Sequence, residues 1–320
     1  MPSFWTHVAF AEDCKQRILT HDPATAGELT QAICARPHAF YTGMQGPDLF
    51  LFYLPAAIRK RKLSSVLHTK ETAKLLCRLF ARAHAFRGED RLCALSYVSG
   101  FLGHYLLDSH THAFVYAVAG TDRTARSFCT HNALEADLNR LAVERSLGCS
   151  ISALPRPCSY TLNKDERRIL SDLLSRALCD VYGIACSPAK VSRAFHSVNL
   201  FTRILYDPKG SKAKIARLTE TPLNNRYFSP LFLGESHYFH DPANLAHSRW
   251  VDPYTGEPST ESFFDLYDRA LSRFVPTLRR LETPALDSPR ARKVFFQKLC
   301  ERDFHGEPTE RRLPANFKAR

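Results

Sequence analysis

Histidines and acids recur at intervals of four residues in two segments of this chain, and this spacing constrains the fold more than any other feature. His104, Asp108 and His112 are four residues apart, and His131 and Glu135 repeat the interval. Four residues advance an α-helix by about 400°, so each set lies on one stripe of a helix. Two such stripes that face each other can enclose a metal ion.

The residue types on these stripes favour zinc. Imidazoles and carboxylates are typical zinc ligands, and helices hold such ligands rigidly. The alternative for a single histidine on an apolar helix is a hydrogen-bonded core residue, but burying several unpaired polar groups would cost several kcal/mol. His110 lies about 240° around the helix from His104. We therefore expect it to point toward solvent or to support a ligand.

The rest of the pattern predicts an all-α fold, with no strand ladder and no internal repeat. Apolar periodicity and helix-breaking prolines predict helices at about 4–21, 24–35, 69–87, 89–119, 121–147, 163–182, 187–206 and 289–302, and a long helix that opens at 259–264 and is kinked at Pro276. A long irregular stretch covers 219–258, and such stretches tend to be functional or disordered. We expect a metal-binding helical core at 1–150, additional helices and a loop packed on it at 151–284, and a C-terminal helix with a basic tail at 285–320.

The net charge and the cysteines give weaker information, which concerns the binding partners and the cellular location of the protein. The formal net charge of +12 favours anionic partners such as phosphate esters, lipid head groups or nucleic acid, and it equally fits a basic protein without such a partner. The ten cysteines are scattered without a C-x-x-C pair, which is typical of a reducing compartment. We find no signal-peptide pattern and no run of 18 apolar residues, so the sequence predicts a cytoplasmic protein.

Several ordered motifs resemble the zinc-dependent phospholipase C family, which shares its all-α fold with single-strand nucleases. The resemblance extends from Thr6 to about Leu271. The motifs that carry it are Thr6-His7-Val8-Ala9, Gly46-Pro47-Asp48-Leu49-Phe50, Ser65-Val66-Leu67-His68, Gly103-His104-Tyr105-Leu106-Leu107-Asp108, His112 with His131-x3-Glu135, and Asn244–Pro253 followed by Glu261–Phe264.

This resemblance implies a cluster of two or three zinc ions. One ion would be held by Asp48, His68, His104 and Asp108, a second by His112, His131 and Glu135, and a third by His7 with a bridging Asp108. Two features depart from the family pattern. The gap between Asp108 and His112 is short, so His110 stays an alternative to His112. Trp5 is near the N-terminus, whereas secreted members complete the third site with their own N-terminal tryptophan.

The implied activity is hydrolysis of a phosphodiester, with a metal-activated hydroxide attacking phosphorus in line. Asp48 would act as a ligand and proton acceptor, and Asp108 as the bridging carboxylate. The phospholipase branch implies a phospholipid substrate. The alternatives are a single-strand nuclease or nucleotidase, and a non-catalytic metal-bearing scaffold, which a closed four-ligand site would favour.

A few further segments carry two interpretations each. The run Arg59–Lys62 fits either a contact with an anionic membrane surface or a solvated turn. The aromatic pairs 227–228 and 238–239 fit either lipid or base contacts, or an ordinary core. The dipeptides 21–22 and 240–241 are His-Asp pairs, as in another all-α phosphohydrolase family, but a proline follows each of them. His237 and His240 could form an auxiliary site, whereas His38, His84, His196 and His305 lie outside any ligand spacing.

Overall fold

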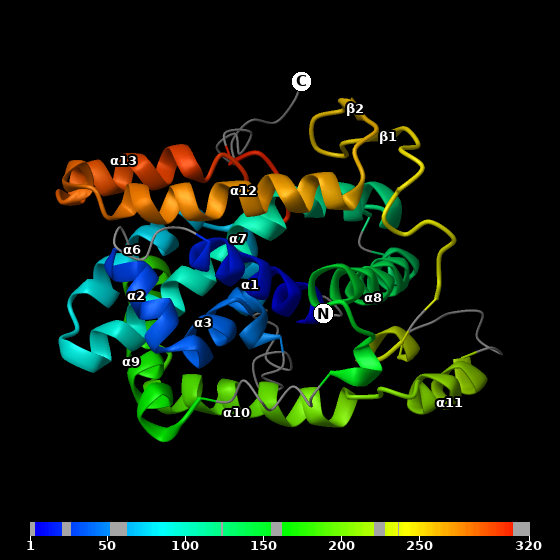
Figure 1. The fold of residues 1–320 in the computed structure, drawn as a ribbon, viewed down its shortest axis with the longest axis horizontal. Coiled ribbons are helices and arrows are strands. Elements are labelled where there is room, and N and C mark those ends of the chain that lie inside the picture. The colour runs from blue at the N-terminus through cyan, green and yellow to red at the C-terminus, as the bar shows by residue number, and fades with distance from the viewer. Residues whose placement is uncertain are drawn as a thin grey trace.

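The longest helix, α7 (Gly88–Ala119), runs through the middle of the molecule (Figure 1). The computed structural model describes residues 4–20, 27–51, 63–122, 124–154, 162–220, 228–235 and 237–309. Nearly every α7 residue from Cys93 to Val115 is buried. Polar side chains on a helix that is covered on all sides need polar partners from neighbouring elements, because burying them unpaired is costly.

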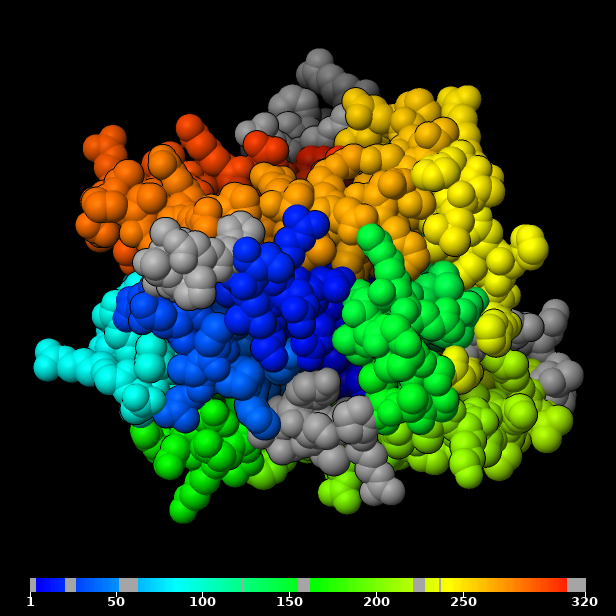
Figure 2. All heavy atoms as spheres, viewed as in Figure 1, coloured from blue at the N-terminus to red at the C-terminus, as the bar shows by residue number. Residues whose placement is uncertain are grey.

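Other helices surround α7 and build the all-α fold predicted from the sequence. The helices packed on it are α1 (Phe4–Leu19), α2 (Glu28–Ala35), α3 (Pro37–Gly43), α6 (Thr72–His84), α8 (Ala125–Leu147), α9 (Lys164–Tyr182) and α12 (Phe263–Leu281). Outside them lie α5 (Leu63–Thr69), α10 (Pro188–Leu205), α11 (Ser211–Glu220) and α13 (Pro289–Leu299). Figure 2 shows α1 and α8 side by side on one face, with α12 across them.

The remaining elements are short. They are the 3₁₀ helices η2 (Gly46–Phe50), η3 (Ile151–Ala153), η6 (Ser229–Leu231) and η7 (Pro284–Leu286), and the strands β1 (Trp250–Val251) and β2 (Pro258–Ser259). The two strands pair antiparallel. They form a small hairpin beside α7, since the Trp250 ring packs on Phe114 at a centroid distance of 5.6 Å.

Local sequence signals explain where several helices begin. Asn163 caps α9 and Ser262 caps α12, each in a reciprocal capping box with the acid three residues later. Thr124 accepts a hydrogen bond from the backbone N–H of Ser127 at the start of α8. α12 continues through Pro276 as one helix.

Three expectations about the elements were wrong in detail. The helix expected at 69–87 is α6, which begins only at Thr72, because Glu71 before it adopts a left-handed conformation with φ 55°; the short helix α5 that precedes it was missed. α11 was missed, and its end overlaps the start of the stretch expected to be irregular. The helix expected at 24–35 begins at Glu28, and residues 21–26 lie outside the described part of the chain.

One continuous hydrophobic core includes Phe10, Leu170 and Phe296, which come from the three segments 1–150, 151–284 and 285–320. The division into those segments stays a prediction. Within the described ranges, none of the helices combines the length and apolar character that a bilayer crossing requires.

Candidate metal centre

The ligands predicted on α7 point to one side of that helix and meet residues from four other elements. His104, Asp108 and His112 are all buried. Their partners come from α1, η2, α5 and α8. The eight predicted ligands form three groups in which the ligand atoms lie within 4.8 Å of one another: the first group (Asp48, His68, His104), the second group (His7, His104, Asp108) and the third group (His112, His131, Glu135).

In the first group, η2 and α5 deliver an acid and an imidazole to α7. Oδ1 of Asp48 lies 3.2 Å from Nε2 of His68. Nδ1 of His68 donates to the backbone carbonyl of Ser64 at 2.8 Å, and Nδ1 of His104 donates to the carbonyl of Met44 at 2.9 Å. These bonds leave Nε2 of both imidazoles directed at the group. Such backbone support is typical of metal-binding histidines.

Gly46 explains why Asp48 can approach α7 so closely. Its φ is 48°, and a Cβ atom at this position would lie 2.5 Å from the His104 ring. Only glycine combines this backbone conformation with the contact. The Gly46-Pro47-Asp48 motif therefore seats η2 directly against the His104 imidazole.

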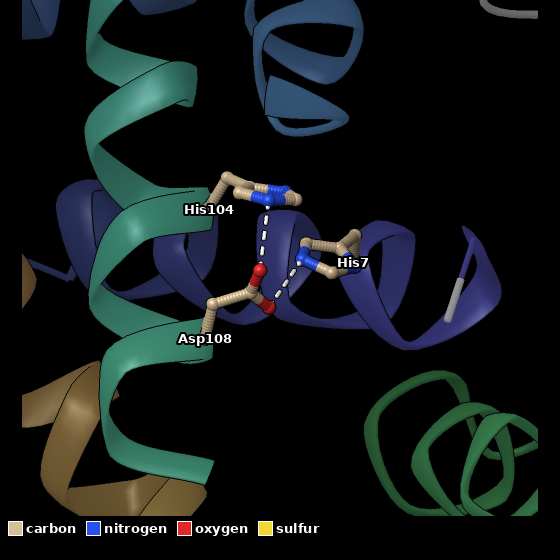
Figure 3. A group of neighbouring side chains, drawn as sticks. All are labelled: His7, His104 and Asp108. Atoms are coloured by element: carbon tan, nitrogen blue, oxygen red, sulfur yellow. Dashed lines mark ion pairs between the residues drawn. The ribbon is translucent and has the colours of Figure 1, made fainter. Parts of the chain in front are cut away.

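In the second group, the Asp108 carboxylate faces two imidazoles, with one oxygen toward each (Figure 3). Its Oδ1 is 3.2 Å from Nε2 of His7, and its Oδ2 is 2.9 Å from Nε2 of His104. The two rings stack at a centroid distance of 4.1 Å. His104 belongs to the first group as well, so the first and second groups share a side chain.

A polar contact between α1 and α8 holds His7 in place. The backbone N–H and the hydroxyl of Thr6 donate to Oδ1 of Asn139 at 2.8 and 2.9 Å. Thr6 precedes His7 on α1, whereas Asn139 follows Glu135 by one helical turn on α8. This buried contact therefore ties the second group to the helix that carries the third.

The third group joins α7 to α8. Oε1 of Glu135 lies 3.1 Å from Nε2 of His131 and 3.5 Å from Nε2 of His112. The two imidazoles are nearly parallel, at an interplanar angle of 11°. The side chain of His131 is 18% exposed and that of His112 is 11% exposed, while His104 is fully buried. The centre therefore opens to solvent on the side of His131.

The donors in these groups fit zinc. Among the described residues, the buried Nε2 of His104 and Nδ1 of His112 make no hydrogen bond, although carboxylates are close to both. Buried polar atoms without partners are costly, and a cation between imidazole and carboxylate removes that cost. Nitrogen and carboxylate oxygen donors in groups of three are also the usual ligand set of catalytic zinc.

The electrostatics keep the carboxylates charged. Burial alone would raise the pKa of Asp108, but the imidazoles of His104, His112 and His7 hold it well below its usual value. Glu135 follows the same pattern, with burial opposed by His131 and His112. Burial lowers the pKa of His112, but Asp108 and Glu135 outweigh it and raise that pKa to about 9. Without a cation, this cluster therefore holds a proton on an imidazole.

Several alternatives weighed on the sequence lie elsewhere. His110 belongs to none of the three groups; its Nδ1 lies 2.7 Å from the Leu106 carbonyl, and its Nε2 is 3.3 Å from the guanidinium of Arg273. His237 and His240 are exposed and also lie outside the three groups. Residues 21–22, Arg59–Lys62 and Tyr227 fall outside the described part of the chain.

The second His-Asp dipeptide has a local structural role. The Asp241 carboxylate accepts hydrogen bonds from the backbone N–H groups of Leu245 and Ala246 at 2.8 and 2.9 Å. The motif at 244–253 is structural as well, because Asn244 bonds to Ser248 and Glu261 and supports the hairpin that packs on α7.

Sequence spacing missed one histidine. His305 was set aside because it lies outside every ligand interval, yet its ring centroid is 5.5 Å from that of His68 and 6.2 Å from that of His112. It stands between the first and third groups. The signal that could have found it is weak: a glycine follows it in a polar C-terminal turn, Asp303-Phe304-His305-Gly306.

Comparison with known protein families finds a match to the part of the chain that carries the three groups. The family model described as zinc dependent phospholipase C matches residues 6–181, which is more than half of the chain and includes all eight predicted ligands. The match ends on α9, before the helices and loops of the C-terminal part. No curated protein and no solved structure matches the chain.

Proposed function

Because the chain belongs to the zinc-dependent phospholipase C family, we propose that it is a phosphodiester hydrolase that cleaves phospholipid at the cluster around Asp108. The observation that carries the proposal is the convergence of the three groups, of which two share His104. A cluster of linked sites can hold several cations beside one phosphoryl group, which is how many phosphodiesters are cleaved.

We assign the ligands as the geometry groups them. One ion would be held by Asp48, His68 and His104, with Asp108 close by, and another by the third group. His7 and Asp108 would hold a third ion, so the centre takes two or three. When bound, zinc lowers the pKa of a coordinated water to about 7 and neutralises charge on phosphoryl oxygens.

The chain's own carboxylates would accept a proton and hold the ligand imidazoles in place. Burial raises the pKa of Asp48, but the hydrogen bond and charge of His68 together with the charge of His104 outweigh burial and lower that pKa, so Asp48 is ionised at neutral pH. An ionised carboxylate at this edge of the cluster can accept the proton of the attacking water. Asp108 contacts both His7 and His104 and would keep the two imidazoles in place as ligands.

The third group favours catalysis over a structural zinc. Within the described residues it supplies three donors, whereas structural zinc sites are closed by four. A position left for water or substrate is typical of a catalytic site. Its most exposed ligand, His131, would then face the incoming ester.

An apolar rim next to His131 supports a lipid substrate. Phe128 lies one helical turn before His131 and is 55% exposed, and Val118 near the end of α7 is 40% exposed. A Cβ atom at Gly120 would lie 2.9 Å from Ser127, so the end of α7 meets the start of α8 there. Exposed apolar side chains around an opening are typical of contact with a lipid surface. We propose that this rim touches the membrane peripherally.

The substrate class is tested with one preparation. Elemental analysis should give at least two zinc ions per chain, and chelation should abolish hydrolysis of phosphatidylcholine. Activity on single-stranded DNA without activity on lipid would instead identify a nuclease. Full zinc occupancy with neither activity would identify a scaffold, and less than one zinc per chain would refute the metal centre itself.

The rim is tested with lipid vesicles. Phe128→Ser should reduce sedimentation with phosphatidylcholine vesicles and hydrolysis of vesicle lipid, while hydrolysis of a monomeric short-chain phosphatidylcholine stays unchanged. Leu200→Ser is the control, because Leu200 is 56% exposed on α10 and is remote in sequence from the ligands. Equal effects of the two substitutions would contradict a specific role for the rim.

A further inference from the structure

A C-terminal turn beyond the family match covers part of the metal centre. Arg302 and Pro308 pair as an antiparallel bridge, and the turn between them is closed by Asp303. Oδ1 of Asp303 accepts hydrogen bonds from the backbone N–H groups of His305 and Glu307 at 2.8 and 3.1 Å. The Asp303 side chain is fully buried. The turn therefore has a defined shape that holds His305 at its tip.

Phe304 anchors this turn to the first group. Its backbone N–H donates to the carbonyl of His68 at 3.1 Å, and its fully buried ring lies 5.5 Å from the His68 ring and 5.7 Å from the His104 ring. The Tyr105 hydroxyl donates to the carbonyl of Arg302 at 2.9 Å. The turn is thus tied to α5 and α7, the two helices that carry His68 and His104.

Gly306 brings the turn into direct contact with α7. Its φ is 78°, and a Cβ atom there would lie 3.1 Å from the backbone nitrogen of Ala113, the residue after His112. The Arg302 guanidinium donates to the Gly306 carbonyl at 2.7 Å and pairs with Asp252 at 3.1 Å. These contacts fix the position of the turn on α7, and with it the distance of His305 from the ligand groups.

The imidazole of His305 lies between the first and third groups. Its ring is 5.5 Å from Tyr116 as well as from His68, and 6.2 Å from His112. It belongs to none of the three ligand groups. The rings of His68, His112 and Tyr116 lie around that of His305, so a small group bound at the ligands of the first or third group would lie beside its imidazole.

From this placement we infer that His305 donates a hydrogen bond to an oxygen of the phosphoryl group held at the metal centre. An imidazole carries an N–H donor in its neutral and in its protonated form, and a charged phosphoryl oxygen accepts a hydrogen bond from such a donor. The inference rests on the proposed function, because it requires a phosphoryl group at the centre.

The experiment measures binding of inorganic phosphate to the zinc-loaded full chain by calorimetry, together with zinc content. His305→Ala should weaken phosphate binding about ten- to hundredfold, the usual range for losing a hydrogen bond to a charged group. Zinc per chain should stay at the wild-type value. His305→Gln keeps an N–H donor and should recover part of the affinity. His196→Ala, at an exposed histidine of α10, is the matched control and should bind phosphate normally.

Steady-state kinetics on a short-chain phosphatidylcholine add a second readout. His305→Ala should raise KM and lower kcat, and His305→Gln should restore part of both. Loss of zinc in His305→Ala would overturn the inference by making His305 a ligand, and unchanged phosphate affinity would overturn it directly.

The two proposals fail in different ways. If the zinc-loaded wild type binds phosphate through His305 but cleaves no ester, the proposed function is wrong and the contact stands. If the wild type cleaves lipid and His305→Ala behaves identically, only the contact is wrong. A wild type that binds no zinc overturns both.

Discussion

Oδ1 of Asp108 lies 3.2 Å from Nε2 of His7, although the two residues come from different helices, α7 and α1. The other oxygen of the same carboxylate faces His104 at 2.9 Å. One side chain thus connects the earliest predicted ligand to the central one. Substitutions at this carboxylate are therefore the sharpest test of the centre.

Asp108→Asn should remove the charge that balances the imidazoles around it. Residues that only support metal ligands change metal affinity by about tenfold to hundredfold when they are mutated. We expect Asp108→Asn to lower zinc affinity by at least as much. Activity should fall with it. The measurement is zinc per chain after dialysis against a weak chelator. Asp268→Asn, at a surface ion pair with Arg145, is the control, and equal zinc retention in both variants would argue against a bridging role for Asp108.

Gly46→Ala should displace His104 and reduce zinc binding. The new methyl group would lie 2.5 Å from the imidazole, and the residue would also have to adopt a positive φ. Gly88→Ala separates these effects, because Gly88 has a similar φ of 52° but open space around a Cβ. Circular dichroism and zinc analysis of the pair should show similar backbone strain in both and metal loss in Gly46→Ala alone. Metal loss in Gly88→Ala would point to a general folding defect.

Zinc binding at pH 7 should release a proton from His112. The pKa of this imidazole is raised to about 9 in the metal-free protein, so it is protonated at pH 7, whereas a zinc ligand must be neutral. Apparent zinc affinity should therefore increase with pH, by about tenfold per unit for one proton, and level off above pH 9. Calorimetry in buffers of different ionisation enthalpy counts the proton. An affinity that does not vary between pH 7 and 9 would contradict the assignment.

Asn139→Ala should destabilise the protein by about 1–3 kcal/mol, because it leaves the backbone N–H of Thr6 without its buried acceptor. Thr6 lies in the first turn of α1, where backbone N–H groups have no partner within the helix. Urea denaturation of the metal-free protein measures the change in unfolding free energy. Gln297→Ala, at an exposed position of α13, should change it little. Similar values for both variants would show that the contact between α1 and α8 adds no stability.

The helical ligands could be predicted because their geometry is local. The intervals His104-x3-Asp108-x3-His112 and His131-x3-Glu135 place each set on one stripe of any α-helix, whatever the helix packs against. The family pattern added His7, Asp48 and His68, and the structure brings all of them into the three groups.

Elements and contacts away from the helical ligand stripes were harder to predict. The helix α11 and the break between α5 and α6 depend on contacts and on a left-handed residue at Glu71 that no periodicity reveals. His305 lies 170 or more residues from each of the predicted ligands in the sequence. Its place over the centre depends on the turn held by Asp303 and Phe304 and on the close approach of Gly306 to α7.

By itself, the sequence therefore determined the all-α class and the pairing of candidate ligands along α7 and α8, whereas His7, Asp48 and His68 were implied by the family resemblance. The class and the pairing follow from helical geometry and side-chain chemistry, which are set by neighbours a few residues apart. Only the tertiary structure decided which stripes face each other, that His104 and Asp108 join two groups, and that a distant imidazole closes the space between the groups. Such contacts join residues far apart in the chain, and packing around one shared core is what brings them together.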